Sequence, residues 1–251
     1  MGIFSTIAAG VGKIVSVAKT AIHAVKERIV PVIQKCIPKV AETVKRFSQK
    51  VTDFIEERKP AIEEKKVKIE NIVKKISNVV STVAEAIGLK KPDVDQPEEL
   101  AMKAEKEEEN GVSRQTFDSA KTYIEHLQND VQLTDAQKIE LRDMEPEQKI
   151  GYVVTGTAIY VSGVAEVIQV RETIITPKLL DDFDSLKFNA QKVIQVIKAL
   201  DAHRITDGDL FSDLLHGKAI AAEERQQLRG ALEELSDGNP NELLQDMRDQ
   251  L

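Results

Sequence analysis

The sequence predicts an all-α protein in which amphipathic N-terminal helices precede a C-terminal helical bundle. Residues that break helices are scarce, since 251 residues include only 12 glycines and 8 prolines. Aromatic residues make up 4% of the chain and tryptophan is absent, whereas Ala, Val, Ile, Leu, Lys, Glu and Gln are abundant. This composition favours helices, and apolar positions recur at helical spacing in most segments.

Charge is divided unequally along the chain. Residues 1–90 carry 17 Lys and Arg against 9 Asp and Glu, and residues 91–251 carry 18 against 33. The two parts are therefore about +8 and −15. Such a division is typical of a basic segment that meets an anionic surface, but it also allows the two parts to attract each other.

The first segment, residues 3–30, has the period of an amphipathic helix. At 100° per residue its apolar positions fall within an arc of about 120°. This arrangement suits a lipid interface, where apolar side chains are buried and lysines meet headgroups. Alternatively, the apolar face of this helix packs in the core of the protein itself or in the groove of a partner protein. The predicted membrane-contacting residues are Ile3, Phe4, Ile7, Val11, Ile14, Val15, Ala18, Ile22, Val25 and Ile29, and the predicted anionic-lipid contacts are Lys13, Lys19, Lys26 and Arg28.

Prolines divide the rest of the basic region, residues 1–88. We expect a kink or break over Val30–Pro38, a second helix over Lys39–Lys59 and a third that begins at Pro60 and ends at Gly88. Apolar residues between 62 and 87 repeat with near-heptad spacing, which predicts a coiled-coil-like helix able to form a homo-oligomer.

Residues 89–113 differ in composition from both neighbours. They contain two prolines, an acidic run and few apolar positions. They predict an acidic linker with at most one exposed helical stretch.

The remaining residues, 114–251, predict an acidic helical bundle. Residues 150–165 are apolar all round, which indicates a buried central helix; the alternative is a hairpin that inserts into a membrane, similar in pattern to colicin-like pore-forming domains. Small residues recur there at a spacing of seven and predict a close approach of other helices. The expected helices are Arg114–Leu127, Asp135–Asp143, Pro146–Thr173, Lys178–Leu200, Asp207–Leu215, Ala219–Leu235 and Asn241–Leu251.

No motif in the sequence predicts catalysis, a cofactor or a metal. There is no P-loop, no GxGxxG after a strand and no GxSxG, and the four histidines are scattered without ligand spacing. Nucleic-acid binding is disfavoured because arginine and aromatic residues are rare in the basic region. We therefore expect a non-enzymatic protein.

Two hypotheses follow for function. The first is a membrane-associated or membrane-active protein that uses residues 3–30 on an anionic membrane, with a layout similar to virus penetration proteins or bacterial effectors. The second is a soluble scaffold that assembles through residues 62–87. The single cysteine, Cys36, and the lack of a basic residue before Lys13 predict a cytoplasmic or peripheral membrane protein without a cleavable signal peptide.

Overall fold

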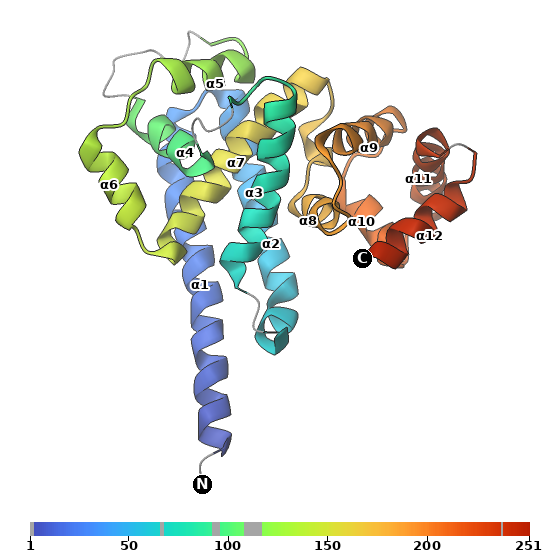
Figure 1. Ribbon diagram of the computed structural model, residues 1–251, viewed down its shortest axis with the longest axis horizontal. Coiled ribbons are helices and arrows are strands. Elements are labelled where there is room, and N and C mark those ends of the chain that lie inside the picture. Colours follow the sequence, from blue (N-terminus) through green and yellow to red (C-terminus); the bar gives the residue numbers. More distant parts are fainter. Residues whose placement is uncertain (1–2, 66–67, 92–95, 108–116, 237) are drawn as a thin grey trace.

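The computed structural model describes the backbone of residues 3–65, 68–91, 96–107, 117–236 and 238–251. Side chains are described from Lys19 onward within these ranges, except at positions 61 and 63–65. The described residues form twelve α-helices and one short 3₁₀ turn, and they contain no strand. The predicted all-α class is therefore confirmed (Figure 1).

Three helices are built from the basic region: α1 (Ile3–Lys35), α2 (Pro38–Lys65) and α3 (Ile69–Ala86). The predicted break over Val30–Pro38 is narrower than expected, because α1 continues through Pro31 and the chain turns only at Cys36 and Ile37. A proline removes one helical hydrogen bond, and the carbonyl that loses it here belongs to the solvent-exposed Glu27.

The second and third helices also meet later than the sequence suggested. Pro60 lies inside α2 rather than at the start of the third helix. The end of α3 follows the prediction, since Gly88 adopts a left-handed φ of 72° and lets Leu89 N donate to Ala84 O.

The central helix is α7 (Pro146–Ile168), and α1, α2, α3, α4 and α5 all pack against it. The predicted buried helix over residues 150–165 is thus found at the middle of the fold. The small residues have the expected use, because a Cβ added at Gly156 would lie 1.6 Å from the backbone oxygen of Pro97. Helix α4 can therefore approach α7 only over a glycine.

The structure differs from the predicted exposed linker at α4 (Pro97–Lys106). The side chains of Leu100 and Met102 are fully buried, so this helix belongs to the core. This short helix has few apolar residues, which is why composition alone suggests a linker, but those it has are buried. Residues 92–95 and 108–113 of that linker lie outside the described residues.

The acidic region adds short helices. The expected helix Lys178–Leu200 is two helices, because Lys187 adopts a left-handed φ of 53° and the Asn189 side chain accepts a hydrogen bond from Lys192 N, which starts a new helix. The elements are α5 (Ala120–Asn129), α6 (Asp135–Asp143), the 3₁₀ turn η3 (Glu172–Ile174), α8 (Pro177–Ser185), α9 (Ala190–Ala202), α10 (Asp209–Leu215), α11 (Ala222–Leu235) and α12 (Pro240–Gln250).

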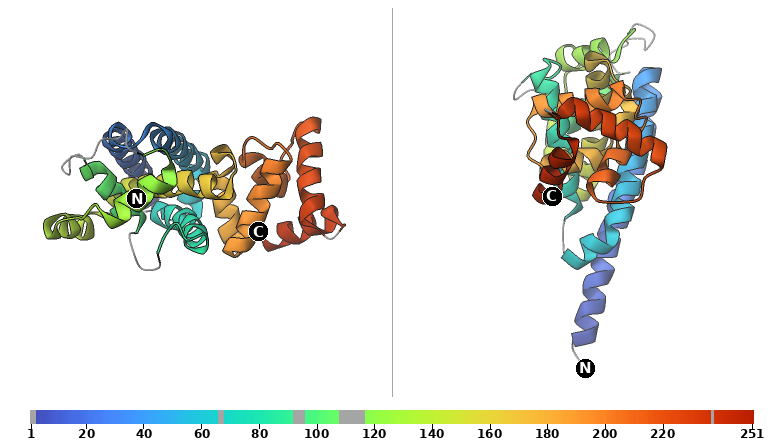
Figure 2. Two further views of the ribbon diagram at one scale, coloured as in Figure 1. Left: turned by 90° about the horizontal axis from the view of Figure 1, so that it is seen from above. Right: turned by 90° about the vertical axis from the view of Figure 1, so that its right-hand side faces the viewer.

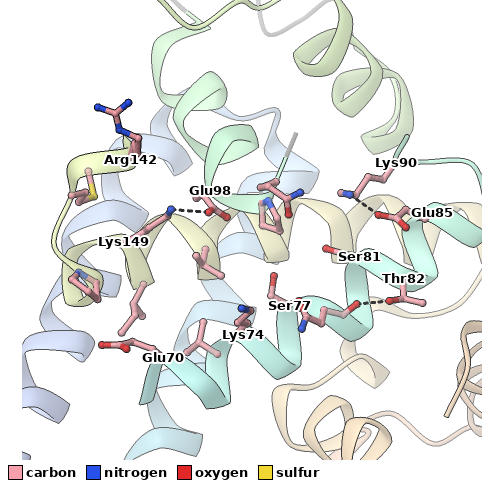
Figure 3. A pocket seen from close by; sticks show the side chains of 18 residues that line it. Glu70, Lys74, Ser77, Ser81, Thr82, Glu85, Lys90, Glu98, Arg142 and Lys149 are labelled. Atoms are coloured by element: carbon pink, nitrogen blue, oxygen red, sulfur yellow. Dashed lines mark hydrogen bonds and ion pairs between the residues drawn. The ribbon is translucent and has the colours of Figure 1, made fainter. Parts of the chain in front are cut away.

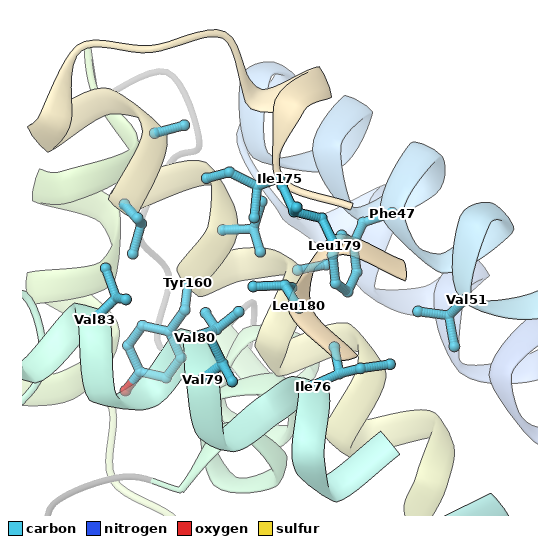
Figure 4. Packing of buried hydrophobic residues seen from close by; sticks show 14 of the residues in the cluster. Phe47, Val51, Ile76, Val79, Val80, Val83, Tyr160, Ile175, Leu179 and Leu180 are labelled. Atoms are coloured by element: carbon cyan, nitrogen blue, oxygen red, sulfur yellow. The ribbon is translucent and has the colours of Figure 1, made fainter. Parts of the chain in front are cut away.

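One hydrophobic cluster joins the two charge regions. Figure 4 shows Ile175 and Leu180, from the segment at α8, packed against Val80 and Val83 of α3. The same cluster runs from Ala21 to Met247. The basic and acidic regions therefore share a core instead of forming separate packing units.

Candidate functional site

The N-terminal part of α1 extends beyond the rest of the molecule. Figures 1 and 2 show this end of the helix projecting away from the other helices in views that differ by 90°. Lys19 and Thr20 are exposed, and Ala21 is the first described side chain that is fully buried. We call residues 3–20 of α1 the arm and residues 21–35 the base.

The arm and the base present their apolar positions in the same direction. Five turns of α-helix contain 18 residues, so positions 18 apart point the same way. Ile3, Ile7 and Ile14 of the arm therefore align with Ala21, Val25 and Val32 of the base, which are fully buried. Helices α2, α4 and α7 pack against α1, and Gly151 of α7 lies close to the backbone of Ala24 in the base.

The predicted membrane-contacting residues are accordingly divided. Val25 is fully buried, and Ile22 and Ile29 are partly buried against the core, so this part of the stripe packs inside the protein. The other predicted contacts belong to the arm, where the helix backbone is described and the side chains are not. They are Ile3, Phe4, Ile7, Val11, Ile14, Val15 and Ala18.

The predicted lipid-binding cations also fall into exposed and engaged groups. Lys19 and Lys26 are exposed. Arg28 is engaged inside the protein, since its guanidinium lies 3.6 Å from Glu105 and 4.7 Å from the centre of the Tyr152 ring. The side chain of Lys13 lies outside the described ones.

Several cations of α2 and α3 pair with carboxylates of the acidic region. The opposite charges of the two regions therefore attract each other within the protein, which is one of the two alternatives that the sequence allows. The pairs are Lys39–Glu166 at 2.6 Å, Arg46–Glu172 at 3.3 Å, Lys50–Asp207 and Lys50–Asp209 at 2.7 Å, Arg58–Asp181 at 2.6 Å and Lys75–Asp184 at 3.2 Å.

Glu166, at the end of α7, joins three helices. Its carboxylate accepts hydrogen bonds from Lys39 Nζ of α2 and from the backbone amides of Ala120 and Lys121 at the start of α5. Burial favours a higher pKa for Glu166, but these hydrogen bonds outweigh burial and lower the pKa. An ionised Glu166 therefore fixes α2 and α5 to α7.

The near-heptad residues of α3 are occupied within the chain. Helices α7, α8 and α9 pack against α3, and the apolar stripe is buried by them. A second copy could reach this face only if these helices moved away. The buried apolar residues of the predicted assembly segment are Ile62, Ile69, Ile72, Val73, Ile76, Val79, Val80, Val83 and Ala84.

A polar groove of about 820 Å³ lies between α3, the start of α4 and the start of α7 (Figure 3). Lys149 Nζ lies 3.1 Å from Glu98, and Lys90 Nζ lies 2.5 Å from Glu85. Both lysines are thus already paired with carboxylates of the groove lining.

A buried polar cluster surrounds the junction of α1 and α2. Tyr123 Oη lies 2.9 Å from Glu107 Oε2 and 3.6 Å from Cys36 Sγ, while His126 Nδ1 lies 2.9 Å from Asp130. Burial raises the pKa of Tyr123, so the phenol stays protonated and acts as a donor. Cys36 is only 3% exposed, and the cluster fastens α5 to this junction.

The described part of the chain brings together no group of three His, Cys, Asp or Glu side chains that could hold a metal ion. Among the same residues, α7 is the one helix long and apolar enough to cross a membrane, and 83% of its apolar window is buried in the fold. Comparison with known protein families, curated proteins and solved structures gives no match.

Proposed function

We propose that this protein binds anionic lipid membranes peripherally through the arm, and that the helical body serves a non-enzymatic role as the folded domain attached to it. The observation that carries the proposal is the continuation of α1 past the body. The apolar stripe of the base has the body to cover it, whereas the arm continues the same sequence pattern to an end that projects beyond the other helices.

Charge supports a lipid partner. The first 26 residues contain Lys13, Lys19 and Lys26 and no Asp or Glu. Each lysine near an anionic leaflet contributes about 1 kcal/mol, in addition to burial of the apolar stripe. Lys19 and Lys26 are exposed and can reach headgroups without breaking an ion pair with the acidic region.

Co-sedimentation of the full chain with vesicles of phosphatidylcholine and phosphatidylserine tests the proposal. We expect the native protein to bind and the variant Ile7→Glu/Val11→Glu/Ile14→Glu to bind at least about a hundredfold more weakly, because each buried apolar side chain contributes roughly 1.5–3 kcal/mol. Failure of the native chain to bind would refute the proposal.

A matched control separates the stripe from net charge. The variant Gln34→Glu/Gln132→Glu/Gln148→Glu adds the same charge at exposed positions of the base and the rest of the body. It should retain binding, because exposed charges distant from the contact are screened by salt. Equal losses in both variants would show that general repulsion, rather than the arm, explains the effect.

Assembly through residues 62–87 is the weaker proposal. It requires the buried face of α3 to leave its own core. Light scattering at several protein concentrations would support it if the native chain self-associated and a variant at this face, Val80→Ala, did not.

A further inference from the structure

We infer that the arm enters the lipid hydrocarbon steeply and tip-first, rather than lying flat along the interface. This inference rests on the proposed function and concerns how the arm meets the bilayer. It follows from the direction in which the apolar stripe points relative to the body.

The body lies on the same side of α1 as the stripe. By helical spacing, residues 7 and 14 of the arm lie on the same face of α1 as Val25 and Val32, which are fully buried in the body. Helices α2, α4 and α7 pack against α1. A flat membrane that touched the stripe along the arm would therefore pass through these helices.

A straight α1 leaves one way to place the stripe in lipid. The helix is continuous from Ile3 to Lys35, and the projecting end continues along its line (Figures 1 and 2). If the bilayer meets the tip of the arm first, the body stays on the water side and no helix has to move. The entry angle is then set by the axis of α1.

The distribution of charged residues along the arm is consistent with insertion of its first residues into one leaflet. Residues 3–12 contain no charged side chain and span about 15 Å at 1.5 Å per residue, which is half of a hydrocarbon core of about 30 Å. Lys13 and Lys19 follow about 9 Å apart along the axis, a separation that lets both reach the headgroup layer. The uncharged stretch of the arm, residues 3–12, thus matches one leaflet in length.

Depth-dependent fluorescence quenching distinguishes the two orientations. Single cysteines introduced in the full chain by Ser5→Cys, Ile7→Cys, Ala9→Cys and Val11→Cys carry an environment-sensitive fluorophore. Cys36 stays in place because it is only 3% exposed, and labelled native protein gives its background. The probe is a vesicle of phosphatidylcholine and phosphatidylserine that contains lipids with quenchers at known depths.

Tip-first entry predicts a steady decrease in depth from position 5 to 7, 9 and 11, by about 3 Å at each step. A flat arm predicts alternation, because positions 7 and 11 lie on the stripe and positions 5 and 9 lie on the opposite face. Gln34→Cys, on the exposed side of the base, should remain unquenched.

The outcomes separate this inference from the proposed function. Alternating depths with intact binding would overturn tip-first entry and leave membrane binding standing. Absence of vesicle binding would overturn the proposed function itself. Energy transfer between differently labelled copies, with no quenching by lipid, would overturn tip-first entry by showing that a second copy covers the stripe.

Discussion

The base and the arm of α1 carry the same apolar pattern but have different surroundings. Ala21, Val25 and Val32 of the base are fully buried by other helices, whereas the N-terminal end of the arm projects past those helices (Figure 1). Helical periodicity identifies the face that avoids water, because it depends only on residue order. It does not identify what covers that face.

The largest expected effect tests this difference directly. Val25→Asp should lower the free energy of unfolding by about 4 kcal/mol, because an unpaired carboxylate would be placed in the core. Ile7→Asp, the matched change 18 residues earlier, should alter stability by less than about 0.5 kcal/mol. Urea denaturation measures both values, and equal losses would show that the arm is packed as tightly as the base.

The packing of neighbouring segments against α7 can be tested by substitutions at its glycines. Gly156→Ala should cost about 1–3 kcal/mol of stability, since the new Cβ would meet the backbone of Pro97 and α4 would have to shift. Gly163→Ala meets only the ends of the Ile124 and Leu89 side chains, which can move, and should cost less. Thermal unfolding compares them, and a reversed order would contradict the assignment of α4 as a core helix.

The paired cations of α2 differ from the exposed cations near the arm. Glu166→Gln should lower stability at neutral pH by about 1–2 kcal/mol, because Lys39 and two backbone amides lose an ionised acceptor.

The sign of the pH dependence follows from the lowered pKa of Glu166 in the folded state. Its contribution is present above the usual glutamate pKa of about 4.3 and is lost as the pH falls through the lower folded value. Denaturation between pH 7 and pH 3 should therefore converge for the native chain and the variant. A constant difference across this range would contradict the role assigned to the ionised form.

The smallest expected effects distinguish a paired cation of α1 from an exposed one. Arg28→Ala should cost about 1 kcal/mol of stability through loss of Glu105 and Tyr152, with little change in vesicle binding. Lys19→Ala, at an exposed cation that tip-first entry places at the headgroups, should leave stability unchanged and weaken binding to anionic vesicles about fivefold, equivalent to about 1 kcal/mol. The opposite assignment of effects would show that Arg28 faces the lipid.

Sequence patterns located helices best where start signals were clear. The predicted bounds of α6 match the structure, and Thr134 and Gln137 form the capping box that starts it. A capping box also starts α4, where Gln96 and Glu99 form it and Pro97 occupies the first turn, although the composition there suggests a linker. Asn189 was overlooked as the start of α9.

The candidate site was only partly accessible to sequence reasoning. The stripe over residues 3–30 and the cations beside it could be identified from spacing. The position at which burial begins, Ala21, could not be identified in this way. The burial of Val25 depends on helices that come from distant parts of the chain and pack against α1, namely α2, α4 and α7. The ion-pair partners of Lys39 and Arg58 depend on the same long-range packing.

The sequence by itself determined that this chain is helical, that residues 150–165 lie at its centre and that α1 has one apolar face. These properties depend on local propensity and on a period of 3.6 residues, both of which are encoded in residue order. Only the tertiary structure decided that α4 is core, that the acidic region pairs with α2 and α3, and where α1 leaves the body. Burial and charge pairing are properties of neighbours in space, and those neighbours exist only after the chain has folded.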